Sequence, residues 1–215
     1  MTELKKYIKT YFGVSNDDVT KISSFFRPTI LKKGDFFLKT GRHSDMFTKS
    51  ILLTAFGLTI SSGLFAQNNS TMKSINEKAP VKCGKTITID ASSEKVWAVM
   101  TNINSWATWQ TEISYSKLNG ELKPETTFDW KTGGAKIHST LHTVEPFKQF
   151  GWTGKTLGMF AIHNWTLTVK DGKTMVTVEE SMEGFFAKLL KKSFNKNLEK
   201  GMKTWLVLLK KECEK

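Results

Sequence analysis

Two residues, His163 and Glu180, combine side-chain types and a spacing that could support acid–base chemistry. The dipeptide Asp171-Gly172 between two runs of alternating apolar residues predicts a hairpin with a two-residue turn, in which His163 lies directly opposite Glu180. Opposed residues on neighbouring strands hold their Cβ atoms about 5 Å apart, so the imidazole and the carboxylate can form a hydrogen bond. Such a pair could act as acid and base in a cyclisation, a dehydration or a hydrolysis, and both are candidate catalytic residues.

The same pair has two interpretations that involve no catalysis. It could anchor a polar group of a bound ligand. It could also be a structural pair near the rim of the sheet, since hydrogen bonding offsets the cost of burying polar groups. The sequence shows no obvious serine or cysteine nucleophile beside the pair.

Aromatic side chains are concentrated on the same face of the predicted strands. The first turn places Trp165 on the side of His163, and a second turn at Gly133-Gly134 places Trp130 and Phe128 on the corresponding side, because side chains alternate along a strand. A ligand held there is expected to contact eight residues: Phe128, Trp130, Leu141, Phe150, Trp152, Trp165, Leu167 and Val178. The other tryptophans are expected to fill core volume: Trp97, Trp106, Trp109 and Trp205.

The remaining histidines and glycine-rich strings do not predict a metal or phosphate site. His138 and His142 lie four residues apart on a predicted strand, about 13 Å at 3.3 Å per residue, and both are expected on the outer, solvent-exposed face. Gly-Lys-Thr strings begin at Gly84, Gly154 and Gly172, but none has the earlier glycine of a P-loop. We therefore expect neither a metal ion nor a cofactor.

The elements that must position these residues follow from hydrophobic periodicity. Residues 85–90 alternate like a strand, Ser92 or Ser93 caps a helix, and a series of hairpin strands follows. A long helix over residues 184–212 comes last, with an apolar stripe at three- and four-residue steps. The stripe comprises Phe186, Leu190, Phe194, Leu198, Met202, Trp205 and Leu209. The opposite, solvated face carries Lys188, Lys191, Lys192, Lys196, Lys200 and Lys203.

Three stretches of the sequence carry a family resemblance: ITIDASSEKVWAVMTNINSWATWQ, FGWTG and HNWTLTVKDGKTMVTVEES, followed by the long final helix. This part, residues 82–215, resembles the SRPBCC superfamily, which includes START-like proteins and polyketide cyclases/dehydrases. The resemblance implies an α+β helix-grip fold, with a curved antiparallel sheet wrapped around the C-terminal helix. It also implies binding or transport of a hydrophobic small molecule or lipid, or alternatively a cyclase/dehydratase using His163 and Glu180, because fold alone does not assign chemistry.

Residues 1–45 form a separate region. Ser15 followed by Asp17 and Asp18 predicts the start of a helix, and Pro28 ends it. With the later KKGDFFLKTG, this region resembles the start of a Crp/Fnr-type regulator, which leaves a remnant or fusion of such a regulator as a further alternative. The rest of the nucleotide-binding barrel and the DNA-reading helices are missing, so we expect a poorly packed fragment that binds neither nucleotide nor DNA.

Residues 46–66 have the pattern of a bacterial export signal. Met46 and one lysine precede an apolar stretch, and Leu64-Phe65-Ala66 supplies the small residue of a cleavage site. The alternative is a buried apolar helix, because the stretch is short for a membrane span. If translation starts at Met46, we expect a periplasmic or secreted protein, and otherwise a cytoplasmic or membrane-associated one. A polar linker, residues 67–81, follows.

Composition restricts the partners without choosing one. The net charge is +12, spread along the chain, and no nucleic-acid-reading motif accompanies it, so we expect no nucleic acid partner. The lysine-rich face of the last helix could touch an anionic membrane. The two cysteines, Cys83 and Cys213, match no metal-ligand spacing, and two free thiols are expected in preference to a bridge.

Overall fold

The computed structural model describes residues 5–6, 8–10, 13–25, 72–156 and 158–215. The predicted export signal and the segment from Pro28 to the end of the Crp/Fnr-like region lie outside the described residues. The predicted polar linker is described from residue 72 onward.

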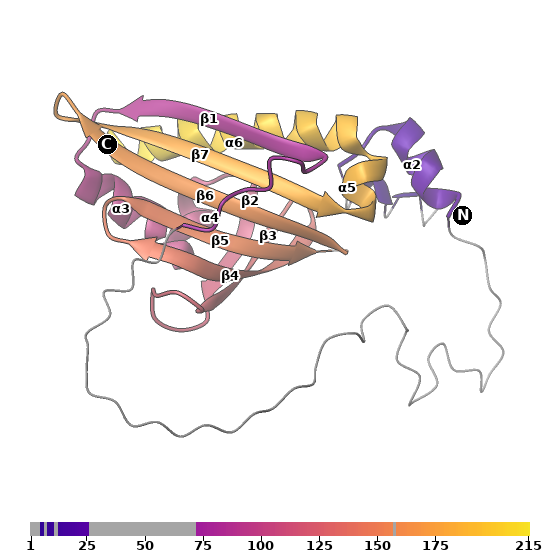
Figure 1. The fold of residues 1–215 in the computed structure, drawn as a ribbon, viewed down its shortest axis with the longest axis horizontal. Coiled ribbons are helices and arrows are strands. Elements are labelled where there is room, and N and C mark those ends of the chain that lie inside the picture. Colours follow the sequence, from indigo (N-terminus) through magenta and orange to yellow (C-terminus); the bar gives the residue numbers. More distant parts are fainter. Residues whose placement is uncertain (1–4, 7, 11–12, 26–71, 157) are drawn as a thin grey trace, which may run out of the picture. The chain divides into compact units, whose positions relative to one another are not determined.

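A seven-stranded antiparallel sheet, in the order β1-β7-β6-β5-β4-β3-β2, forms the frame of the domain (Figure 1). The sheet is curved, and its concave face holds the long C-terminal helix, so the expected α+β helix-grip fold is confirmed. The strands are β1 (Val81–Ile89), β2 (Ile113–Leu118), β3 (Thr127–Thr132), β4 (Ala135–Glu145), β5 (Gln149–Thr156), β6 (Met159–Lys170) and β7 (Lys173–Gly184).

Two tight turns set the strand register that the sequence predicts. Asp171 and Gly172 have φ angles of 51° and 74°, the left-handed conformation that a two-residue hairpin turn requires. The β6–β7 ladder consequently pairs His163 with Glu180, as expected. The Gly133-Gly134 turn likewise pairs Trp130 with Ile137 across β3 and β4. The Asn119-Gly120 dipeptide does not form a two-residue hairpin turn of this kind, because β2 and β3 are joined by a longer loop over residues 119–126.

Helices close the concave side of the sheet. α3 (Ser93–Thr101) begins at Ser92, whose hydroxyl accepts a hydrogen bond from Lys95 N, and η1 (Ile103–Ser105) and α4 (Trp106–Trp109) follow it. The predicted C-terminal helix is broken at Leu190 into α5 (Phe185–Leu189) and α6 (Lys191–Cys213). Its apolar stripe faces inward and is buried except at half-buried Phe186, whereas the six lysines predicted to be solvated are all exposed.

The described part of residues 1–45 is better packed than expected. α2 (Asn16–Ser23) begins at the predicted cap Ser15, which accepts from Asp18 N. Four apolar side chains of this part are buried, namely those of Ile8, Val14, Val19 and Ile22. This part lies beside α6, where Asn197 Nδ2 donates to Gly13 O at 3.0 Å.

Residues 72–80, here called the strap, cross the outer face of the sheet instead of forming the free linker that the sequence suggests. Asn164 Nδ2 of β6 donates to Lys73 O at 2.8 Å, and Asn76 N donates to Ser181 Oγ of β7 at 3.0 Å. Ile162 and Asn164, which alternate with inward-facing His163, are consequently buried on this outer face.

Cys83 and Cys213 are both free, as expected. Within the described ranges, no helix is both long and apolar enough to cross a membrane.

Candidate functional site

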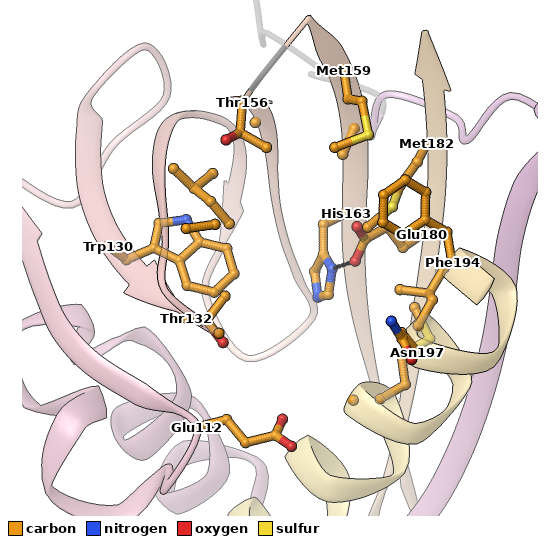
Figure 2. Close-up of a pocket in the computed structure, with 18 of the residues that line it drawn as sticks. Glu112, Trp130, Thr132, Thr156, Met159, His163, Glu180, Met182, Phe194 and Asn197 are labelled. Carbon is orange, nitrogen blue, oxygen red and sulfur yellow. Dashed lines mark hydrogen bonds and ion pairs between the residues drawn. The ribbon is translucent and has the colours of Figure 1, made fainter. Parts of the chain in front are cut away.

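A cavity of about 330 Å³ lies between the concave face of the sheet and α6 (Figure 2). Its volume is at the lower end of the range of small-molecule sites. Its wall is mainly apolar and aromatic. The residues that line it from the strands include Trp130, Ile137, Trp152, Met159, Ala161, His163, Glu180 and Met182, and those from α6 are Phe194, Asn197, Leu198, Gly201, Met202 and Trp205.

The His163–Glu180 pair lies in this wall, on adjacent strands. His163 Nδ1 and Glu180 Oε2 are 2.5 Å apart, and the two residues are only 7% and 9% exposed. A short hydrogen bond between titratable groups that are buried together is an arrangement that can bind a polar group or transfer a proton. Figure 2 shows both side chains reaching into the open space from neighbouring strands.

Aromatic rings fix the orientation of the imidazole. The indole of Trp152 stacks on it, with ring centroids 4.2 Å apart and planes inclined by 15°, and Trp165 lies at 5.5 Å. With the ring held in this way and Nδ1 engaged by Glu180, the other nitrogen, Nε2, is buried and has no hydrogen-bond partner among the described residues. A buried polar atom without a partner is costly to the stability of the fold.

The eight predicted ligand-contact residues divide into two groups. Trp130 and Trp152 line the cavity. The other six are buried in the core and are not among the residues that line it: Phe128, Leu141, Phe150, Trp165, Leu167 and Val178. They share the correct face of the sheet, but helices pack on part of that face.

Trp106 of α4 explains much of this difference. It is fully buried and contacts Phe128, Trp152 and Trp205 with centroids 5.2 to 5.6 Å apart. Trp97 of α3 packs in the same way against Phe150 at 6.0 Å. The two helical tryptophans therefore fill one end of the concave face, as expected of core residues, and leave the cavity at the other end.

The helix side of the cavity is the part that the sequence interpretation missed. Trp205 was expected to fill core volume, yet it lines the cavity together with Leu198 and Met202. The signal was present in the apolar stripe of the C-terminal helix, since a helix gripped by a sheet must present that stripe to the same space.

The outer face holds a second histidine of interest, half-buried His142. His138 is exposed, as predicted, and bonds to Asp129 at 2.8 Å. His142 lies on the outer face as predicted, at a bulge between Leu141 and Thr143, but the expected solvent exposure was wrong, because it is half-buried and its Nε2 is covered beside Gly151 and Asn164. Burial, and next the positive charge of Lys73, lower the pKa of His142 to about 4.

Neither histidine cluster forms a metal site within the described ranges, where no three His, Cys, Asp or Glu residues are grouped closely enough to hold an ion.

A curved antiparallel sheet that encloses a cavity with its C-terminal helix defines the helix-grip class of folds. This chain belongs to the polyketide cyclase / dehydrase and lipid transport family, whose model matches residues 80–214. The SRPBCC resemblance is thereby confirmed. The match does not include residues 1–45, so their likeness to Crp/Fnr-type regulators stays a prediction.

Solved structures support the fold. A hypothetical protein from Helicobacter pylori is 19% identical, with a TM-score of 0.57 over 65% of this chain and 95% of that chain. The Zhui aromatase/cyclase from Streptomyces sp. R1128 is 14% identical, with a TM-score of 0.51 over 62% and 93%. The di-domain ARO/CYC StfQ from the steffimycin biosynthetic pathway is 11% identical, with a TM-score of 0.54 over 62% and 50%. No curated protein matches the chain.

Proposed function

We propose that this chain binds a hydrophobic small molecule or lipid in the cavity between the sheet and α6, and acts as its carrier or sensor. The supporting observation is an apolar, aromatic cavity of about 330 Å³ whose wall contains one buried polar pair. Sites that bind small molecules combine an apolar wall with few polar groups in this way.

A cavity-filling variant tests the proposal. Ala161 lines the cavity from β6, where it is paired with Gly154 and Met182, so Ala161→Leu places added volume inside the site. The neutral dye N-phenyl-1-naphthylamine should bind the wild-type protein with enhanced fluorescence and bind the variant about 10-fold more weakly or less. Val207 of α6 is 58% exposed, so Val207→Leu is the matched control and should bind the dye as the wild type does. Equal binding by all three proteins, or no binding by the wild type, would contradict the proposal.

A second candidate function is a cyclase/dehydratase reaction in which His163 and Glu180 act as acid and base. It is favoured by the place of both residues in the cavity wall, where a 2.5 Å hydrogen bond joins a possible acid to a possible base. In this case His163→Ala keeps its affinity for the ligand and loses turnover, with Glu180→Gln as a second variant. A wild-type protein that binds its co-purified ligand and returns it unchanged would leave only carriage.

Contact with a membrane is a further proposal. It is supported by six exposed lysines on α5 and α6. Vesicles containing anionic lipid should retain the protein at low salt and release it at high salt, whereas neutral vesicles should not retain it. Failure of anionic vesicles to retain it would end this proposal.

Export follows only from the sequence of residues 46–66, and we propose it on that basis. Native mass spectrometry of protein purified from cells tests it through the mass of the chain, which reports whether residues up to Ala66 have been removed. The same spectrum reports any co-purified hydrophobic compound. An intact chain in the cytoplasmic fraction would overturn the export proposal and leave the binding proposal untouched.

A further inference from the structure

The mouth of the cavity is marked by the described residues that line it and are also exposed, namely Gly13, Glu112, Gly133 and Asn197. Gly13 comes from outside the sheet and α6. It belongs to residues 8–10 and 13–25, here called the N-terminal segment. Asn197 Nδ2 of α6 donates to the carbonyl oxygen of Gly13 at 3.0 Å. The N-terminal segment is therefore attached at the mouth, on the helix side of the cavity.

The same segment reaches the sheet side of the mouth. Gly133 and Gly134 form the turn between β3 and β4, and Gly133 lines the cavity. The position that a Cβ would take on Gly134 lies 3.4 Å from Thr10 O. Thr10 therefore lies against the turn while Gly13 lies against α6, so the N-terminal segment crosses the mouth from the sheet wall to the helix wall.

The N-terminal segment is held by side chains and not by a strand ladder, because its described part is helical. Besides the Asn197 contact, Ser193 Oγ of α6 donates to Asp18 Oδ2 of α2. Its four buried apolar side chains belong to the same core cluster as those of α6: Ile8, Val14, Val19 and Ile22. A segment that rests on a few side-chain contacts at the end of a chain can detach while the sheet stays intact.

Gly13 gives the segment a hinge. Its N–H bonds to Lys9 O at 3.0 Å, and its φ angle of 58° is the left-handed conformation that ends a helix. α2 follows at once, with Ser15 as its cap. One residue thus carries the change of direction between two helical pieces, so α2 can swing away from α6 by rotation at this position. The family model begins at residue 80, so the segment is an addition of this chain to the shared fold.

We propose that the N-terminal segment is a lid over the mouth of the cavity, and that a ligand enters and leaves when α2 detaches from α6. This inference rests on the proposed binding function and concerns the rate of ligand exchange, not the identity of the ligand. The lid acts in the full chain. A chain cut after Ala66, as the export proposal expects, would have an open cavity.

A double variant that loosens the lid tests the proposal in the full chain. Val19→Ala with Ser193→Ala removes one apolar anchor of α2 and one hydrogen bond, and neither residue lines the cavity. Stopped-flow fluorescence with N-phenyl-1-naphthylamine should show association and dissociation each about 10-fold faster than in the wild type, because both losses favour the detached lid. The affinity should change by less than about 3-fold, since the cavity wall is unaltered.

The matched control makes the same kinds of change away from the lid. Val207 is exposed on α6, and the Thr204 hydroxyl donates to Lys200 O within the same helix, so Val207→Ala with Thr204→Ala should exchange the dye at the wild-type rates. Equal rates in all three proteins would overturn the lid and leave the binding function standing. Faster dissociation with unchanged association would make the segment a fixed wall and also overturn the lid. No binding by the wild type would overturn both proposals.

Hydrogen exchange of the wild-type protein tests the opening without a dye or a variant. The amides of α2 should exchange through a local opening whose rate does not depend on low concentrations of urea. The amides in the β6–β7 ladder should exchange only when the whole domain unfolds. Exchange of the α2 amides with the same urea dependence as the ladder would show that the segment does not open by itself, and would overturn the proposal.

Discussion

Each face of the sheet holds a histidine in different surroundings, His163 buried on the concave face and His142 half-buried on the outer face. On the concave face, His163 is bonded to the Glu180 carboxylate, and both residues line a cavity. On the outer face, His142 is bonded to the Thr143 hydroxyl at 2.8 Å, and its Nε2 is buried beside Asn164. His163 has an acidic partner and lies beside a cavity, an arrangement that permits ligand chemistry. His142 has a neutral partner and lies near the strap, an arrangement that serves packing.

The strongest test of this contrast removes the acid from the concave pair. Glu180→Leu leaves His163 without its partner in a buried site, and we expect the free energy of unfolding to fall by about 3 kcal/mol, since breaking a buried pair costs more than replacing it. Urea unfolding measures this. Glu179→Gln, the neighbouring residue on the other face, should change stability by less than about 0.5 kcal/mol. A similar small effect at both positions would make the pair energetically unimportant.

A smaller effect is expected from crowding the outer cluster. A Cβ at Gly151 would come within 2.5 Å of His142 Cε1 and 2.8 Å of Asn164 Oδ1, so Gly151→Ala should destabilise the fold by about 1–3 kcal/mol. Gly201→Ala is the matched control, because nothing lies within 4 Å of the position of the added Cβ. Alanine forms helix better than glycine, so this variant should raise the free energy of unfolding by about 0.5–1 kcal/mol. Adding His142→Ala should restore part of the loss at Gly151, and absence of any such coupling would contradict the packing account.

The smallest effect is the contribution of His142 to the pH dependence of stability. The pKa of His142 is lowered from 6.5 to about 4 in the folded protein, where Lys73 and His163 are its charged neighbours. As pH falls from 6.5 towards 4, the unfolded chain binds a proton that the folded protein does not, so stability decreases with falling pH. With solvent screening, the loss is about 1–2 kcal/mol. Urea unfolding at several pH values should show that the free energy of unfolding depends less steeply on pH in His142→Asn than in the wild type. Identical slopes for the two proteins would contradict this prediction.

The hairpins and their pairing were predictable because tight turns restrict register. The left-handed residues at Asp171-Gly172 fix the alignment of β6 and β7, so the partner of His163 follows from counting. The long helix and its exposed lysines followed from periodicity in the same way. Local signals of this kind determine local geometry.

The cavity lining and the position of His142 depended on tertiary packing, which sequence periodicity does not report. Trp106 and Trp97 fill one end of the concave face, a fact that requires the path of α3 and α4 in space. The half-burial of His142 depends on its neighbours Gly151 and Asn164, and the polar strap that covers Asn164 looks like a linker in sequence.

The strap also determines where this domain can be excised as an independent piece. A fragment starting at residue 82, where the sequence resemblance begins, would lack the backbone carbonyl that receives the Asn164 amide and the amide that reaches the Ser181 hydroxyl. Two polar groups and the adjacent Ile162 would then be opened to water on the convex surface. A recombinant fragment should therefore begin at or before residue 72, ahead of residue 80, where the match to the family model begins.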